Sequence, residues 1–254
     1  MLRFTFKELL KTVKALFFKE IRSFLNSLVG YLAIIVFLLT TGMFLWFFDY
    51  PTNILNNGEA TMQPLFQIAP YVFMFLIPAI TMRSFSDEHR NGTMEILLTK
   101  PISDMGIIIA KYAAGVLLVI LALLPTLVYY YSIIQLGEVK GNIDHAGTWG
   151  AYIGLLLLGM TFAAIGIFAS SITKNQIIAF LIAVLICFVV YIGFQFLADN
   201  FSAPWDMFFI KLSVQEHYLS MQRGVIDSRD VIYYISAIMI FLLSTKISLQ
   251  SRFW

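Results

Sequence analysis

The chain alternates long apolar runs with short polar segments, and six runs contain no Asp, Glu, Lys or Arg. A transmembrane helix needs about 20 mostly apolar residues, because it rises about 1.5 Å per residue across a hydrocarbon layer of about 30 Å. The pattern therefore predicts six transmembrane helices. The six runs are residues 29–47, 60–82, 112–137, 146–173, 175–198 and 231–245.

The last run is short, with only 15 residues between charged positions. It can still span a membrane if the long side chain of Lys246 reaches toward the headgroups and residues 247–249 extend the helix. The first run begins too late and is too long for a cleaved signal peptide, so we expect it to remain as a membrane anchor.

The distribution of Lys and Arg predicts the orientation. With six spans both termini share one side of the membrane, and thirteen of the 17 Lys and Arg residues fall on that side. Cytoplasmic loops are enriched in these residues. The sequence therefore predicts cytoplasmic termini.

Composition supports a membrane protein. The chain is 59% hydrophobic and 13% charged, against about 25% charged in average globular proteins. The net charge of +2 and the absence of a basic run give no indication of nucleic-acid binding. We expect an all-α integral membrane protein with a single domain over residues 1–254.

Residues 4–24, before the first apolar run, have the pattern of an amphipathic helix. Apolar residues recur at spacings of three and four, with Lys7, Lys11 and Lys14 on the other side. Such a helix can lie flat in the headgroup region. Packing on the protein's own loops is the alternative.

The polar segment 83–104 is expected to begin with a short helix. Ser84 or Ser86 could cap that helix, with Asp87 and Glu88 in its first turn near the positive helix end. Gly92 would then end it.

A second short helix is expected to follow. Thr93 could cap it, Glu95 lies early, Lys100 lies late and Pro101 would end it. An ordinary charged loop is the alternative, although it gives no reason for two sets of start and stop residues.

Two further features lie in the second half of the chain. Residues 199–230 are too apolar for a free loop, and we expect short re-entrant helices buried against the spans. The fourth apolar run carries small residues four apart, as in Gly150 and Gly154, which allows close helix packing. Packing within one bundle and packing between subunits both remain open.

The sequence contains no motif for an enzyme or for an energy source of its own. No Gly-Lys pair is present, which excludes a nucleotide-binding P-loop, and the three histidines lie in three different loops. The first five apolar runs hold no acid or base other than tyrosine and Cys187, whereas ion-coupled carriers usually bury such groups. If the protein moves a substrate, we expect the energy to arrive from outside the chain.

The stretch FSDEHRNGTMEILLTKPIS at residues 85–103 resembles the cytoplasmic segment between the second and third spans of type-2 ABC exporter permeases. The order of parts, with an amphipathic N-terminal helix, six spans and a long last outer loop, is also similar. The stretch HYLSMQRGVIDSRDVIYY at residues 217–234 further resembles bacterial permeases associated with gliding motility. The matching residues of the first stretch are Phe85, Asp87, Glu88, Arg90, Gly92, Thr93, Glu95, Leu97, Leu98, Pro101 and Ser103.

The resemblance implies a non-catalytic permease subunit in a cell inner membrane. It would pair with an identical or related permease and dock on a cytoplasmic ATPase that binds ATP and Mg. Segment 83–104 would be the coupling helix that enters a groove of the ATPase. The implied docking residues are Phe85, Asp87, Glu88, Arg90, Gly92, Thr93 and Glu95.

A passive membrane protein is the alternative function. The aromatic-rich outer loop would suit a scaffold for a larger complex, and the lack of an energy source would suit an uncoupled channel or lipid scramblase. A neighbouring ATPase gene would favour the transporter.

Overall fold

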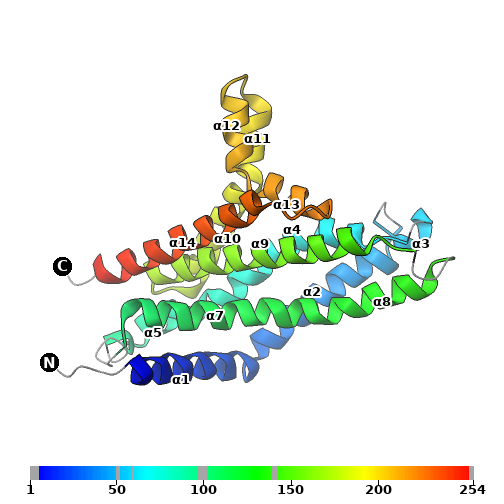
Figure 1. The fold of residues 1–254 in the computed structure, drawn as a ribbon. Coiled ribbons are helices and arrows are strands. Elements are labelled where there is room, and N and C mark those ends of the chain that lie inside the picture. The colour runs from blue at the N-terminus through cyan, green and yellow to red at the C-terminus, as the bar shows by residue number, and fades with distance from the viewer. Residues whose placement is uncertain (1–5, 50–51, 59, 96–101, 139–141, 252–254) are drawn as a thin grey trace.

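The computed structural model describes residues 6–49, 52–58, 60–95, 102–138 and 142–251. These residues form helices and connecting segments without a β-strand, as predicted (Figure 1). Six helical stretches are long and apolar enough to cross a membrane. They are Leu28–Trp46 (α2), Gln63–Arg90 (α4 and α5), Asp104–Leu136 (α7, η1 and α8), His145–Ile172 (α9), Gln176–Asn200 (α10, η2 and α11) and Ser228–Gln250 (α14).

The last span is longer than its uncharged run. Helix α14 covers 23 residues because it begins at Ser228, where the Asp227 side chain accepts a hydrogen bond from Arg229 N, and continues past Lys246. The expectation that this run could span a membrane by extension is therefore confirmed.

Helix α9 (His145–Ile172) is the centre of the bundle and packs against α4 (Gln63–Thr81), α7 (Asp104–Leu123), α10 (Gln176–Phe188) and α14. Its small residues face these neighbours. A Cβ at Gly166 would overlap the Thr81 side chain, and one at Gly150 would lie 2.9 Å from Gly224 Cα. The small-residue pattern therefore serves packing within the bundle.

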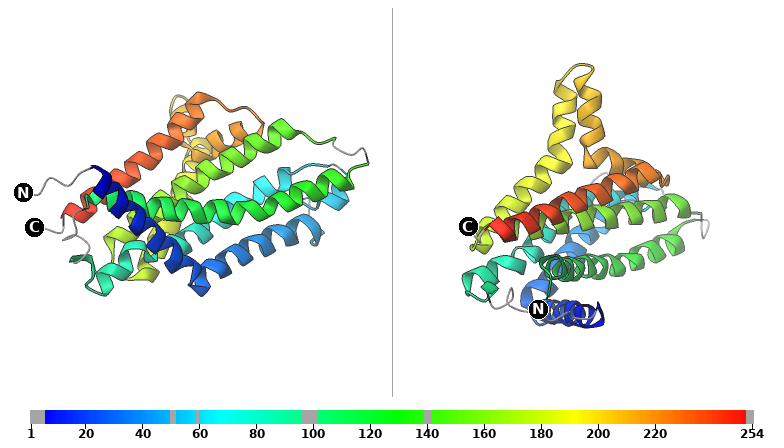
Figure 2. Two further views of the ribbon diagram at one scale, coloured as in Figure 1. Left: turned by 60° about the horizontal axis from the view of Figure 1, so that its bottom comes forward. Right: turned by 60° about the vertical axis from the view of Figure 1, so that its left-hand side comes forward.

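The beginning of α1 (Phe6–Leu25) and the end of α14 lie at the same end of the bundle as α5 (Arg83–Arg90) (Figure 1). Helix α1 crosses α7 obliquely near this end (Figure 2). Leu16, Glu20 and Ile21 of α1 are buried, whereas Lys11 and Lys14 are exposed. The helix is amphipathic as predicted, and its inner face packs on a span.

The predicted beginning of the first short helix in segment 83–104 is wrong. Helix α5 follows α4 after a single turn residue, Met82, and neither Ser84 nor Ser86 caps it. Both serines are buried, and Asp87 lies in the second half of the helix. Gly92 has φ +68° in the turn that follows, as a helix-ending glycine should.

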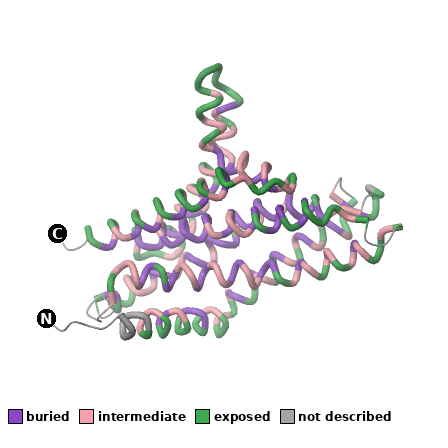
Figure 3. Tube along the Cα trace, in the orientation of Figure 1, coloured by how far each residue is buried: buried purple, intermediate pink, exposed green. Residues whose placement is uncertain are grey.

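The expected burial of the outer loop is only partly correct. Helix α13 (Val214–Gln222) packs on α9 and buries Val214, Tyr218 and Met221. In contrast, α11 (Phe194–Asn200) and α12 (Trp205–Leu212) form a hairpin that projects away from the bundle (Figures 1 and 2), and α12 has no buried residue. This exposure is visible along the tip of the hairpin (Figure 3).

The three remaining short elements are α3 (Ile54–Asn57), η1 (Leu124–Thr126) and α8 (Leu127–Leu136). Pro125 lies in η1, where the third span changes from α7 to α8. In the fifth span, the segment η2 (Val189–Gly193) is a π-helix between α10 and α11.

Candidate functional site: a buried ion cluster beneath the charged segment

An ammonium group is buried at the end of the bundle that carries α5. Lys111 of α7 is 2% exposed. Its Nζ donates to Glu20 Oε1 of α1 at 3.0 Å, to Glu88 Oε1 of α5 at 3.0 Å and to the backbone oxygen of Ser84 at 2.6 Å. One side chain therefore connects three helices.

The cluster satisfies the needs of a buried cation. An ammonium has three N–H donors, and all three find acceptors here. Nζ also lies 5.1 Å from the centre of the Phe85 ring, at a distance that gives a cation–π attraction. A buried charge is tolerated only when paired and hydrogen-bonded in this way.

A second lysine covers the outer edge of the cluster. Lys19 Nζ lies 3.7 Å from Glu88 Oε1 and 3.9 Å from Glu20 Oε1, with its side chain 64% exposed. It balances the second carboxylate, because Lys111 alone leaves two negative charges against one positive. Being exposed, Lys19 contributes far less than Lys111.

The first turn of α5 is attached to the central helix. Ser170 Oγ of α9 accepts hydrogen bonds from Phe85 N at 2.7 Å and from Ser86 N at 3.2 Å. These amides lie where the break at Met82 interrupts the helical ladder of the second span. The serine thus replaces intrahelical acceptors and holds α5 against α9.

The far end of α5 has a different environment. Asp87 accepts a hydrogen bond from Gln176 Nε2 of α10 and lies 3.4 Å from Arg90 Nη2. After Gly92, Thr93 N donates to Glu88 O at 3.0 Å. This end of α5 is therefore linked to the fifth span and closed by a turn.

A family model for ABC-2 family transporter proteins matches residues 14–249. The chain belongs to this family. No curated protein sequence matches it. As an ABC-2 transporter protein, the chain is a multi-pass membrane component of an ABC transporter, a permease subunit.

The predicted docking residues of this permease differ in exposure. Phe85 is fully buried, and the Glu88 side chain is 13% exposed and turned toward Lys111. Asp87 is partly exposed and bonded to Gln176. The predicted positions that face outward are Arg90, Gly92, Thr93 and Glu95.

Some predicted positions fall outside the described part of the chain. Residues 96–101, which include Lys100 and Pro101, belong there, and so does the side chain of Lys7. Among the described residues, no group of three His, Cys, Asp or Glu could hold a metal ion.

The sequence reading of this permease missed Glu20, Lys111 and Ser170. Glu20 had a visible signal, because it lies four residues after Leu16 on the apolar stripe of α1. An acid on an apolar stripe requires a partner. Lys111 directly precedes the apolar run 112–137, and only the extension of α7 back to Asp104 places it inside the bundle.

Proposed function

We propose that this ABC-2 permease is the non-catalytic membrane subunit of an ATP-driven exporter. A separate cytoplasmic ATPase docks on α5 and the turn that follows it, and the ATPase binds ATP and Mg. Closure of the ATPase pushes α5, and the spans transmit that push to a substrate. The side of the bundle that carries both termini faces the cytoplasm of a cell with an inner membrane.

The observation that carries this proposal is the attachment of α5 to the bundle. A segment that receives force can transmit it only if it is fixed to the elements that must move. Lys111 fixes α5 to α1 and α7, and Ser170 fixes it to α9. Burial of the ion cluster makes these links strong, since a separated pair would leave a charge unpaired in an apolar site.

The exposed end of α5 supplies the docking surface. Arg90, Thr93 and Glu95 are exposed and present a positive, a polar and a negative group at the end of α5 and in the segment after it. Mixed charges of this kind favour one partner and orientation over others. Phe85 and Glu88 act on the opposite side as anchors, so we assign them a positioning role.

We further propose that two permease subunits pair in the membrane. The hairpin of α11 and α12 supports this, because it exposes large apolar side chains away from its own bundle, with Phe196 at 65% and Trp205 at 60%. A contiguous apolar surface of this type suits contact with a second subunit. The similarity of residues 217–234 to gliding-associated permeases leads us to propose that the transporter serves a gliding or secretion machine.

Replacement of the exposed docking residues tests the proposal. The double variant Arg90→Ala/Glu95→Ala removes both exposed charges without touching the buried cluster. We expect it to lose co-purification with the partner ATPase and to lose substrate-stimulated ATP hydrolysis. Arg229→Ala, an exposed change at the beginning of α14 and outside the segment, is the control.

Side-specific labelling tests the orientation independently. In a Cys187→Ala background, a cysteine at position 95 should react only with reagents that reach the cytoplasm, and one at position 229 only with reagents outside. Unchanged ATPase binding by the double variant would refute the proposed docking surface. Labelling of position 95 from outside would refute the transporter mechanism and favour the passive scaffold.

A further inference from the structure

A histidine joins three helices at the base of the projecting hairpin. His217 of α13 has its ring Nδ1 2.7 Å from Asp230 Oδ1 in the first turn of α14. Its Nε2 lies 3.1 Å from the backbone oxygen of Lys211 in the last turn of α12. The side chains of His217 and Asp230 are 18% and 9% exposed. Both residues belong to the stretch 217–234, to which the docking of an ATPase gives no role.

A tyrosine of α14 reinforces this contact. The Tyr233 ring stacks on the His217 ring with centroids 3.9 Å apart, and its hydroxyl donates to Leu212 O at 2.6 Å. Lys211 O and Leu212 O are carbonyl oxygens of the last turn of α12, which have no intrahelical donor. Among the described residues, these two hydrogen bonds join α12 to α13 and α14. We call His217, Asp230 and Tyr233 the hairpin latch.

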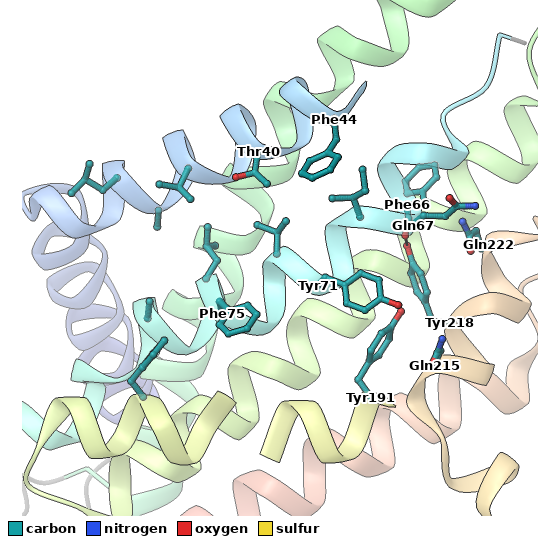
Figure 4. Close-up of a pocket in the computed structure, with 18 of the residues that line it drawn as sticks. Thr40, Phe44, Phe66, Gln67, Tyr71, Phe75, Tyr191, Gln215, Tyr218 and Gln222 are labelled. Carbon is teal, nitrogen blue, oxygen red and sulfur yellow. Dashed lines mark hydrogen bonds between the residues drawn. The ribbon is translucent and has the colours of Figure 1, made fainter. Parts of the chain in front are cut away.

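Helix α13 is a fixed support for the latch. Four of its residues line a groove between α2 and α4, on the helix face opposite His217 (Figure 4). On that face Tyr218 is fully buried and donates its hydroxyl to Phe66 O of α4 at 2.7 Å, where Pro70 supplies no N–H. Burial raises the pKa of the Tyr218 phenol well above its ordinary value, which keeps the donor proton in place. Helix α13 is thus held to the second span, whereas α12 has no buried residue and depends on the latch.

The contacts of the latch require one proton more than a neutral imidazole provides. A backbone oxygen can only accept, so Nε2 of His217 carries the hydrogen that it shares with Lys211 O. A neutral imidazole has a single N–H, and its Nδ1 would then turn a lone pair toward a carboxylate oxygen 2.7 Å away. A second proton between Nδ1 and Oδ1 turns this repulsion into a charge-assisted hydrogen bond. The latch is therefore satisfied only when His217 and Asp230 together hold the second proton, whichever of them carries it.

The carboxylate of the latch meets no other donor in the described part of the chain. Asp230 Oδ2 is buried without a hydrogen-bond partner, and the hydroxyls of Tyr233 and Tyr234 donate to backbone oxygens of residues 212 and 214 instead. Helix α9 and segment η2, which also pack on α13, contain no Asp, Glu, Lys or Arg. The other charged residues near the latch are Lys211 on α12, Glu216 on α13, and Asp227 and Arg229 at the beginning of α14. Loss of the second proton leaves Asp230 with a lone pair facing it, which is costly in a buried site.

We propose that the latch is a proton-dependent switch, which holds the hairpin while the pair of His217 and Asp230 keeps its second proton and releases it when that proton leaves to water. The closed latch binds the proton more tightly than the open latch, so closure is favoured at low pH and weakened as the pH rises. Histidine is the side chain that ordinarily changes charge between about pH 5 and 8. The switch stands on these contacts alone. That it responds to the outer side of the membrane rests on the proposed function, because Asp230 lies at the end of α14 opposite α5.

Distance measurement by pulsed electron paramagnetic resonance tests the switch in the full chain in lipid nanodiscs. Spin labels are attached to Met207→Cys on α12 and Ile240→Cys on α14, both exposed positions, in a Cys187→Ala background. Dilution with unlabelled chain restricts the measurement to distances within one chain. We expect a narrow distance distribution at about pH 6 and a broader, shifted distribution at about pH 9, since these values lie on either side of the ordinary range of histidine.

Two substitutions separate a proton switch from an ordinary structural contact. Asp230→Asn offers an amide N–H to Nδ1 of a neutral imidazole, so the latch is satisfied without the second proton, and we expect the narrow distribution at both pH values. His217→Gln removes the titrating ring, and we expect the pH response to be lost. His145→Gln is the matched control, because that histidine bonds Tyr130 at the beginning of α9 and should leave the response unchanged.

The same distribution at both pH values in the parent chain, or a pH response that survives His217→Gln, would overturn the proposal. Broadening of Asp230→Asn at the higher pH to the extent seen in the parent would also overturn it, because the amide would then not replace the proton. The measurement needs neither an ATPase nor a transported substrate. Its failure is therefore separate from failure of the docking test, and a response that persists after docking fails would leave the switch in a protein with another function.

Discussion

Replacement of Lys111 by Met is the most informative change at the ion cluster. The substitution keeps an unbranched apolar stem of similar length and removes only the ammonium. Glu20 and Glu88 would then remain in a buried site with one exposed lysine nearby. We expect marked destabilisation together with release of α5 from α7.

The expected size follows from the geometry. At 3.0 Å and an effective dielectric constant of about 20, each ion pair is worth about 5–6 kcal/mol before desolvation is subtracted. Desolvation offsets much of this, and removal of one partner from a buried pair typically costs about 3–5 kcal/mol. For a chain of this size that loss corresponds to roughly 6–20 °C in Tm.

Thermal unfolding of the purified protein in detergent measures the effect. Lys19→Met is the control, because that lysine pairs with the same carboxylates but is exposed, and we expect a cost of about 0–1 kcal/mol. The triple variant Lys111→Met/Glu20→Met/Glu88→Met removes the whole set of buried charges. We expect it to recover most of the lost stability, because replacement of a complete buried ion cluster by hydrophobic residues of similar volume is often neutral.

Two results would refute this reasoning. If Lys111→Met and Lys19→Met had the same small effect, the cluster would not be buried as described. If the triple variant were no more stable than Lys111→Met, the loss would come from packing around the lysine stem and not from unpaired carboxylates.

Three further predictions concern other parts of the molecule. Tyr218→Phe should cost about 1–3 kcal/mol in thermal unfolding, because it leaves Phe66 O buried without a donor; no change in Tm would argue against that bond. Gly166→Ala should cost about 1–3 kcal/mol by forcing α9 away from Thr81. Combination with Thr81→Ala, which removes the hydroxyl that the new Cβ would overlap, should recover part of the loss if the steric account is right. Trp205→Ser on the exposed hairpin should leave the Tm of the monomer unchanged and weaken subunit pairing, which light scattering measures. A lower Tm of the monomer would instead indicate that Trp205 packs within the core of its own subunit.

The number and approximate positions of the spans follow from the sequence alone. Each span must satisfy its own backbone hydrogen bonds in hydrocarbon, so a long apolar run forms a helix whatever its neighbours are. The limits of the helices differ from those of the runs, since α7 begins at Asp104 and α14 continues past Lys246. The same holds for the turn at Gly92, whose φ of +68° is a local requirement that glycine meets. These features could be predicted because the physical cause and the residues lie in one segment.

The face that each span turns to its neighbours was decided only by the tertiary structure. A helix in lipid is apolar on all sides, and lipid is as apolar as a packed leucine, so hydrophobic periodicity gives no direction. Glu20 and Lys111 lie 91 positions apart and meet only because α1 crosses α7. The ion cluster depends on that crossing, whereas the number and approximate positions of the membrane helices do not.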